Sequence, residues 1–541
     1  MSTSHFFNNK LVKLPGAYSR IKAESPALFS NADYSKVLIL NTNPDYAFGG
    51  SVTGQVTTGG DAFYRFKTLP EARAFFKSGY LWYVVQQLFQ PSKLQGRQGI
   101  SELQVMNALT STAPLITMSI AASGASLVLY VKDESANGNG VKKDVSAVED
   151  RPEVNLKSGY ALSLEAGTKD PTKFVIKLWQ GTYKGEWTDG LSYDGVSVAD
   201  AIPELIIASP EISTVNEFVA WANADETFNM GFKVKSSANG TFVPGDITSN
   251  KFVLATGGAA AYNPNDLTKA FDLLKNGDFS IVLSLNKVGD TNADTLNASL
   301  QYFVQSETRF HKYLAVAGSG TFNTDLAAAQ GFNSEYVWCI YGTPRKASSL
   351  MPLGYREFDS LSLAASVVGR IAGLPPQVPG TFKDIDIDGL KTPLTEGQLE
   401  DALDSGLMTV NWDDDLRVFC ITRAINTLQN NANLQNPDGS TFSIQISRIC
   451  TQLNVEVVVN AKKQIFSSNE TANLFTVSTS YLKNWIKSYL STKIATPQQD
   501  NLILGIKDVS VEKQGDALYA SYEFYPNSEV AFLFFTGIAI Y

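Results

Sequence analysis

The sequence predicts a multidomain protein of mixed α/β and α+β class, with a β-rich insertion between its α/β parts. The chain has 541 residues, which is too long for one ordinary hydrophobic core, so several domains are expected. Hydrophobic residues make up 44% of the chain and charged residues 18%, a composition typical of folded proteins. The hydrophobic pattern changes near residues 111 and 251, and these changes divide the chain into regions with different predicted structure.

The N-terminal region is predicted to be an extended linking arm, residues 1–24, followed by the first part of a folded core, residues 25–110. The arm contains one short apolar stretch, which Pro15 and Gly16 soon interrupt. Within the core part, residues 37–41 have the apolar run of a buried strand. Residues 71–90 have the pattern of one helix that ends before Pro91.

Residues 111–250 are predicted to form a β-rich outer insertion domain. Short strand patterns alternate here with polar turns that are rich in glycine and asparagine. We expect one helix in this region, at residues 215–222, because Thr214 and Glu217 have the spacing of a capping box. The expected strands are residues 126–132, 160–166 and 174–179.

Residues 251–435 are predicted to be an α/β layer domain, because apolar strand patterns alternate here with amphipathic helices. The expected strands are residues 279–285, 313–317, 335–341 and 416–422. Two helical faces are defined by residues that recur at a spacing of three or four. These residues are Leu267, Ala270, Phe271 and Leu274 in the first, and Leu296, Leu300, Phe303 and Val304 in the second.

The C-terminal region, residues 436–541, is predicted to be an α+β domain with helices at 444–466 and 479–493. Strands are expected at 502–512 and 517–525, and a third at 529–541. The third strand is apolar on both faces, so it must be covered on both sides. We therefore expect the chain to end inside a sheet, either its own or that of a neighbouring molecule.

The sequence does not indicate an enzyme, and no cofactor is predicted. His5 and His311 are the two histidines of the chain, no neighbouring motif identifies either as a general base, and no G-x-S-x-G motif occurs. Two glycine-containing segments, Gly-Gly at 257–258 and Gly-Ser-Gly at 318–320, lack the spacing of a phosphate-binding loop. Both are predicted to be turns from a strand to a helix.

Two acidic segments resemble metal sites, but no metal is predicted. Asp384, Asp386, Asp388 and Gly389 match the opening of a calcium loop. The position that should supply a bidentate carboxylate is Thr395, so a solvated acidic turn is favoured. The three aspartates at 413–415 are interpreted as a charged surface turn before a strand.

Charge and cysteine usage limit the partners and the compartment. The net charge of −9 argues against a general nucleic-acid binder, which would need clustered Lys and Arg. Cys339, Cys420 and Cys450 are scattered among apolar residues, so we expect buried thiols and a reducing compartment. The start of the chain lacks the pattern of a signal peptide, and no apolar window is long enough to predict a membrane-spanning helix.

Several short motifs occur in an order that resembles the tail sheath proteins of contractile-tailed bacteriophages. The stretch from Leu14 through Pro15, Gly16 and Ala17 to Tyr18 is similar to the N-terminal Pro-Gly-x-Tyr signature of that family. Residues 357–376, 392–408 and 416–428 resemble successive passages of its C-terminal half. The resemblance covers residues 1–24 and 251–541, and it does not extend to residues 111–250.

The resemblance implies a structural protein whose middle domain has a subtilisin-like arrangement without a working catalytic triad. Copies would stack as six-fold rings around a tail tube and contract to drive the tube through the host envelope for genome delivery. The implied partners are other copies, the tail tube protein, and the baseplate and tail terminator proteins, without direct nucleic-acid contact or membrane insertion. The protein would be part of the virion tail sheath and would be assembled in the host cytoplasm.

The resemblance also implies that both ends of one subunit add strands to a hairpin of another. The residues of the N-terminal arm would be Val12, Leu14, Pro15, Gly16, Tyr18 and Ile21. Those of the C-terminal strand would be Val530, Phe532, Phe534, Ile538 and Ile540. The recipient hairpin would present Ile503, Ile506, Val509, Leu518, Ala520, Tyr522 and Phe524.

Two alternatives remain open from the sequence. The first is the sheath of a related contractile injection system, such as a contractile bacteriocin. The second is a carbohydrate-binding tail or surface protein in which the β-rich region 111–250 is the active module.

Overall fold

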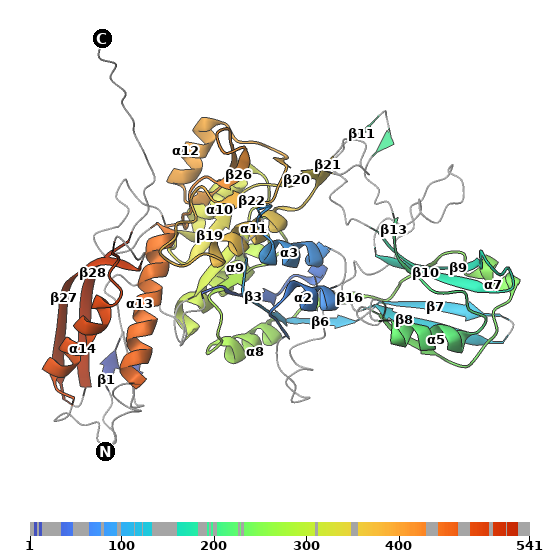
Figure 1. Cartoon of the computed structure of the whole chain (residues 1–541), viewed down its shortest axis with the longest axis horizontal. Coiled ribbons are helices and arrows are strands. Elements are labelled where there is room, and N and C mark those ends of the chain that lie inside the picture. The colour runs from blue at the N-terminus through green and yellow to red at the C-terminus, as the bar shows by residue number, and fades with distance from the viewer. Residues whose placement is uncertain are drawn as a thin grey trace, which may run out of the picture.

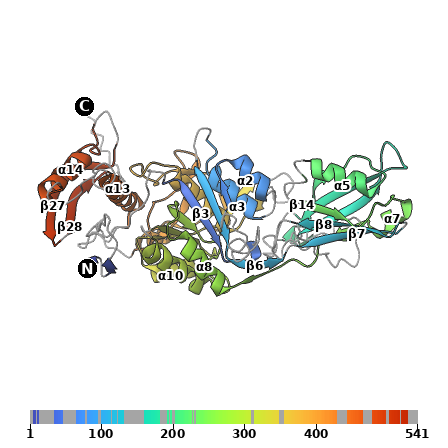
Figure 2. The same ribbon diagram turned by 90° about the horizontal axis from the view of Figure 1, so that it is seen from below.

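A computed structural model of the chain shows three bodies in a row (Figure 1). A central α/β unit lies between a β-rich unit and a C-terminal unit of two helices and a hairpin, and a second view shows the same order (Figure 2). The structure describes residues 5–7, 10–12, 34–46, 64–76, 80–94, 99–112, 114–121, 123–131, 159–181, 192–193, 196–197, 203–225, 228, 232–308, 312–347, 355–428, 442–463, 477–496, 501–515 and 517–527.

The central unit contains a seven-stranded sheet with the order β24-β19-β18-β17-β3-β5-β4. All neighbouring strands in it are parallel except β4, which runs antiparallel to β5 at the edge. Its strands are β3 (Lys36–Asn41), β4 (Tyr64–Phe66), β5 (Glu102–Asn107), β17 (Ile281–Leu283), β18 (Tyr313–Ala317), β19 (Val337–Ile340) and β24 (Leu407–Met408). The sheet therefore draws strands from two segments that the β-rich unit separates in sequence.

Helices cover both faces of this sheet, which explains why its strands are apolar on both sides. One face packs against α2 (Leu69–Phe76), α3 (Tyr80–Phe89) and α11 (Ser360–Ala372). The other face packs against α8 (Pro264–Leu274), α9 (Ala293–Tyr302), α10 (Phe322–Phe332) and α12 (Glu396–Asp404). Five π-helical residues, Phe303–Glu307, continue α9. The unit is thus a three-layer, doubly wound α/β structure.

Two small sheets complete the central unit beside α11. The first is β21 (Tyr355–Glu357), β20 (Pro344–Ala347) and β23 (Gly389–Leu390), and the second is β22 (Asp384–Ile385), β26 (Val418–Ile421) and β25 (Val410–Asp413). A short helix, η1 (Pro44–Tyr46), follows β3.

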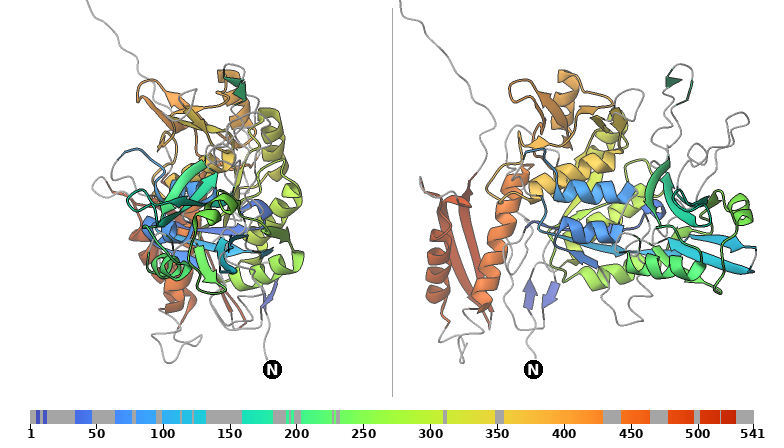
Figure 3. Two further views of the ribbon diagram at one scale, coloured as in Figure 1. Left: turned by 90° about the vertical axis from the view of Figure 1, so that its right-hand side faces the viewer. Right: turned by 45° about the vertical axis from the view of Figure 1, so that its right-hand side comes forward.

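The β-rich unit is two antiparallel sheets packed around one apolar core. Helices α5 (Val215–Ala224) and α7 (Pro244–Ser249) lie on this unit (Figure 3). The first sheet has β13 (Pro203–Ala208), β10 (Phe174–Gly181), β9 (Tyr160–Ala166) and β15 (Val253–Leu254), and the second has β14 (Phe232–Ser236), β8 (Ala125–Val131) and β7 (Leu115–Ile120). A two-stranded ribbon of β6 (Leu109–Thr112) and β16 (Ala259–Tyr262) leads back to the central unit. A further pair, β11 (Ser192–Tyr193) and β12 (Val196–Ser197), forms a separate small hairpin.

The C-terminal unit consists of α13 (Ile444–Lys462), α14 (Thr479–Ser491) and the hairpin of β27 (Ile503–Gln514) and β28 (Ala517–Pro526). These elements share one apolar core that is separate from the others. At the N-terminus, β1 (His5–Phe7) and β2 (Lys10–Val12) pair with each other.

The structure confirms the multidomain α/β class in its coarse form, and most predicted elements lie where the sequence placed them. The strands at 160–166 and 313–317 have the predicted bounds, and Thr214 caps α5 by accepting the N–H of Glu217. The single helix predicted at 71–90 is wrong, because two helices occupy that stretch: α2 ends at Phe76 and α3 begins at Tyr80.

Candidate assembly interface

The hairpin β27–β28 is the candidate functional site, because the sequence predicted it as the acceptor of strands from other copies. Its two strands pair antiparallel over nearly their full length, with Val509 opposite Tyr522. Gly515 stands at the turn with φ of 65°, a backbone conformation that glycine adopts without the steric cost of a Cβ. Apolar residues alternate in β28, whereas two register shifts in β27 bring Ile503, Ile506 and Val509 to the same buried face.

All seven predicted recipient residues lie on the inner face of the hairpin, against α13 and α14. Ile503 and Val509 are fully buried. The other five are partly buried and pack against the same core; they are Ile506, Leu518, Ala520, Tyr522 and Phe524. These side chains hold the hairpin on its own helices, so the parts of the hairpin left for another strand are its backbone edges.

The outer face of the hairpin is exposed, and the sequence interpretation did not single out its residues. Leu504 and Tyr525 are 57% and 56% exposed. Lys507 and Glu523 form an ion pair across the strands at 2.8 Å, and both side chains are 60% exposed. In β28 the alternation that marks the inner face also identifies Glu523 and Tyr525, whereas in β27 the register shifts leave Leu504 and Lys507 exposed.

Both long edges of this hairpin are open in the part of the chain that the structure describes. β27 and β28 form a two-stranded sheet in which each strand has the other as its neighbour. One bridge, from Ile494 to Ile503, covers the first residue of β27. Beyond that bridge, the edges present main-chain N–H and C=O groups, which are the groups that accept an added strand.

The two helices beneath the hairpin are joined by a polar network as well as by their core. Glu456 of α13 accepts a hydrogen bond of 2.7 Å from the hydroxyl of Tyr489 in α14 and forms an ion pair with Lys493 at 2.5 Å. Burial and the nearby carboxylate of Glu456 raise the pKa of Tyr489. This network and the apolar core together give the hairpin a firm base.

Most residues of the two predicted donor segments lie outside the described residues. Val12 is in β2, where it stands opposite His5 of the same chain. Leu14, Pro15, Gly16, Tyr18 and Ile21 lie outside the described part, as do Val530, Phe532, Phe534, Ile538 and Ile540. Their role as donors stays a prediction.

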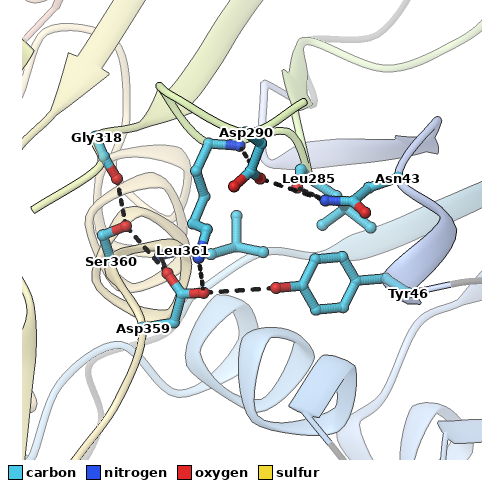
Figure 4. Close-up of polar contacts among 9 residues, drawn as sticks. Asn43, Tyr46, Leu285, Asp290, Gly318, Asp359, Ser360 and Leu361 are labelled. Carbon is cyan, nitrogen blue, oxygen red and sulfur yellow. Dashed lines mark hydrogen bonds and ion pairs between the residues drawn. The ribbon is translucent and has the colours of Figure 1, made fainter. Parts of the chain in front are cut away.

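A second candidate is a polar cluster at the carboxyl ends of the central strands (Figure 4). Doubly wound sheets bind ligands where the winding reverses, and here that point lies between β3 and β17. After β3, the Asn43 amide donates to the carbonyl of Leu285 at 3.0 Å and to the carboxylate of Asp290 at 3.4 Å. Asp290 also accepts the backbone N–H of Lys287 at 3.0 Å.

Asp359 joins this cluster to the start of α11. It is the N-cap of that helix, accepts the N–H of Leu361 at 3.1 Å and forms an ion pair with Lys287. The hydroxyl of Tyr46 approaches the same carboxylate at 3.5 Å, as Figure 4 shows. Burial raises the pKa of Asp359 to about 6.

The chemistry of this cluster is that of a brace between strand ends. The hydroxyl of Ser360 lies within hydrogen-bond distance of two acceptors, the carbonyl of Gly318 and the carboxylate of Asp359, the latter at 3.0 Å. The amino group of Lys287 is held by Asp359. The groups drawn in Figure 4 bind one another, which ties the ends of β3, β17 and β18 to α11.

The acidic segment 384–388 begins with strand β22 (Asp384–Ile385) and continues as a bend, and its three carboxylates are ion-paired, so the interpretation as a solvated turn is wrong for the buried Asp384. Asp384 pairs with Arg370 at 3.2 Å, and Asp386 pairs with Lys346 at 2.8 Å. Asp388 pairs with Lys93 and accepts the N–H of Ala347 at 2.8 Å. The intervening residues, Ile385 and Ile387, are both 3% exposed and pack in the core beside α11. The carboxylates therefore hold neighbouring elements through cationic side chains.

The other segments that the sequence raised are turns or buried residues. Asp413 accepts the N–H groups of Asp415 and Leu416, which shapes the charged turn before β26. Gly318 begins the predicted turn from β18 to α10, and the amides of Ser319 and Gly320 donate to Asp325, whose pKa is raised by burial. Residues 257–258, in contrast, join β15 to β16, so the predicted strand-to-helix turn there is wrong.

The cysteines, His311, possible metal ligands and possible membrane-spanning helices are placed as follows. The three cysteines, Cys339, Cys420 and Cys450, are free and buried, as expected. His311 lies outside the described residues. In the described ranges, no group of three His, Cys, Asp or Glu side chains is placed to hold a metal ion. No helix in the described part of the chain is long and apolar enough to span a membrane.

Comparison with solved structures finds a protein of similar fold. The protein is similar to the sheath tail protein of Desulfitobacterium hafniense, with a TM-score of 0.53 and 13% identity, over 92% of this chain and 94% of that chain. At this identity the likeness shows the fold alone. It confirms, at the level of the fold, the resemblance to tail sheath proteins that the sequence motifs indicated.

Other matches are weaker. The sheath tail protein Lin1278 of Listeria innocua has a TM-score of 0.46 and 12% identity, over 95% of this chain and 100% of that chain. The helical sheath of the anti-feeding prophage in its contracted state has a TM-score of 0.36 and 16% identity, over 52% of this chain and 78% of that chain. No argument rests on scores this low. No protein-family model and no curated protein matches the sequence.

Proposed function

We propose that the protein is the structural subunit of a contractile tail sheath, in which copies link by adding their terminal segments to each other's β27–β28 hairpin. The observation that carries the proposal is a two-stranded sheet with a firmly packed inner face and, among the residues that the structure describes, two open edges. A pair of strands gains stability when further strands join it, and main-chain hydrogen bonds supply that gain. The sequence supplies two strand-like ends, and the fold is that of a sheath tail protein.

In this proposal the copies form stacked six-fold rings around a tail tube. Each subunit would be linked through two arms, so the array would be multivalent and no single joint would need to be strong. On contraction the rings would rotate and widen while the joints persist, driving the tube through the host envelope. The tube, baseplate and terminator proteins would be the other partners, and the central unit would be the non-catalytic, subtilisin-like domain of the family.

The described part of the β-rich unit gives little support to a carbohydrate-binding function. Sugar-binding surfaces commonly use exposed aromatic rings, which pack on the apolar faces of sugars. Among the described residues of this unit, Leu205 is the one large hydrophobic side chain that is strongly exposed. Trp179 is 8% exposed and donates its ring N–H to Ser163 at 2.8 Å.

Electron microscopy of the purified full chain tests the proposal directly. We expect tubes or six-fold rings from the intact chain. Deleting residues 1–20 should leave the folded units intact, as judged by circular dichroism and melting temperature, but abolish tubes. Monomers or compact trimers of the intact chain that bind glycans would contradict the proposal, and unimpaired tubes from the truncated chain would contradict the role of the N-terminal arm.

A further inference from the structure

The end of β28 is held by a small polar network just before the C-terminal segment begins. Asn527 follows the last residue of β28, and its backbone N–H donates to the carbonyl of Leu502 at 3.1 Å. Its side-chain amide donates to the carbonyl of Asn501 at 2.9 Å. Its own carbonyl accepts a hydrogen bond of 2.8 Å from the side-chain amide of Gln445. The root of the C-terminal segment is therefore fixed on three sides.

Gln445 connects this root to a different unit of the molecule. It lies in the first turn of α13, is 3% exposed, and its Nε2 also donates to the carbonyl of Gln377 at 2.5 Å. Gln377 belongs to the loop that follows α11 in the central unit. One buried amide thus bonds two carbonyls that are 150 residues apart, one from each unit.

The side-chain amide of Gln445 also carries an oxygen, Oε1, that can accept a hydrogen bond. Its Oε1 is buried and has no hydrogen-bond donor among the residues that the structure describes. A buried acceptor without a donor is unfavourable. This cost is offset by the hydrogen bonds that Nε2 donates, or by an additional N–H that donates to Oε1.

We propose that Gln445 is a positioning residue that fixes where, and in which direction, the C-terminal strand leaves its own subunit. This inference rests on the proposed function, because it supposes that the strand joins another copy. A strand that leaves from a fixed root loses less conformational freedom when it pairs, and its effective concentration at the neighbouring edge is higher. Gln445 also transmits the orientation of the central unit to the strand, since it holds Gln377 and Asn527 together.

Gln452 provides a matched control on the same helix. It lies two turns further along α13, is 4% exposed, and its amide donates to Glu456 at 2.5 Å. Replacing either glutamine by alanine removes a buried amide from α13, but only Gln445 contacts the root. A general loss of stability should therefore be similar for Gln445→Ala and Gln452→Ala, whereas a loss of strand positioning should be confined to Gln445→Ala.

Two measurements on the full chain test the proposal. The first is the critical concentration for tube formation, measured by sedimentation; we expect Gln445→Ala to raise it roughly fivefold to tenfold, the effect of one hydrogen bond. Gln452→Ala should leave the critical concentration within about twofold of that of the unsubstituted chain. The melting temperature should fall by a similar amount in the two variants. Equal critical concentrations for the two variants would overturn the proposal.

The second measurement does not require assembly. Spin labels at Ser528→Cys and Ser488→Cys report the spread of distances between the root and α14 in the unassembled chain. Gln445→Ala should broaden this distribution and Gln452→Ala should not; an unchanged width in both would overturn the proposal. If the intact chain forms no tubes or rings, the proposed function fails, and the width of this distribution still decides whether Gln445 positions the root.

Discussion

The central sheet and the C-terminal hairpin differ in how far the rest of the chain covers their faces and edges. Seven strands form the central sheet, helices cover both of its faces, and polar side chains brace the ends of its strands. The hairpin has two strands, one covered face and two open edges in the described part of the chain. In the described part of the chain, the first has open edges only at the short strands β24 and β4, whereas both long strands of the second have an open edge.

This difference indicates where the molecule is complete and where it depends on its neighbours. An isolated hairpin is marginal in water, and here its stability comes from the helices beneath it. Long open edges are an aggregation hazard in a monomer, so a protein that keeps them gains most when specific strands fill them. Changes to the added strands should therefore affect assembly, while changes beneath the hairpin should affect its folding.

The largest effect is expected from Phe534→Lys in the predicted C-terminal donor strand. A lysine there would place an unpaired charge in a covered sheet, at a cost of several kcal/mol, so tubes should be lost. The melting temperature of the unassembled chain should not change. Glu529→Lys is the control, because it also adds positive charge but at the polar start of the segment, and electron microscopy should still show tubes. Normal tubes from Phe534→Lys would mean that this face of the strand is not covered.

A smaller and local effect is expected from Leu490→Ala beneath the hairpin. Leu490 of α14 is fully buried in the C-terminal core, and such truncations cost about 2–5 kcal/mol. Hydrogen exchange should become faster in α14, β27 and β28, and remain unchanged in β3 of the central sheet. Leu273→Ala on α8 is the control, since that side chain is 42% exposed. Faster exchange throughout the chain would show that the two units do not fold independently.

The sequence predicted most of the helices and strands of both regions, but not which side chains form ion pairs and hydrogen bonds between them. Periodicity located β9, β18 and the hairpin because each has a simple apolar pattern with turn residues at its ends. It could not show that Asp384, Asp386 and Asp388 meet cations from three other segments of the chain, since those partners lie 14 to 295 residues away. It also could not reveal Gln445, whose two acceptors lie 68 and 82 residues away.

A pH-dependent effect is expected at the brace of the central sheet. Burial raises the pKa of Asp359 to about 6 from its ordinary value of 3.8, so folding favours the neutral carboxyl. The stabilisation from this group is therefore complete below about pH 4 and is lost as the pH rises through 6. Asp359→Asn keeps an N-cap residue for α11 and removes this titration.

The free energy of unfolding of Asp359→Asn, relative to that of the unsubstituted chain, should therefore rise by about 1–3 kcal/mol between pH 4 and pH 7. Urea unfolding at both pH values measures it, and Asp272→Asn, at a side chain that is 71% exposed, is the control. The slope with pH is the readout, because the carboxyl of Asp359 is neutral at pH 4 and ionised at pH 7, so the cost of its burial and its ion pair with Lys287 both arise over this range. A difference that shrinks as the pH rises would show that Lys287 outweighs burial.

The smallest effect is expected at the outer face of the hairpin, where Lys507 and Val509 allow a comparison two positions apart on one strand. Val509 is fully buried against the helices, so Val509→Ala should lower the melting temperature. Lys507 pairs with Glu523 at an exposed site, where an ion pair adds little stability, so Lys507→Ala should leave the melting temperature unchanged. If tubes of Lys507→Ala also form at the same concentration as those of the intact chain, the outer face is not a contact surface, and the joining of copies is confined to the two edges. A large rise in the critical concentration for Lys507→Ala would instead place a neighbouring copy on this face of the hairpin.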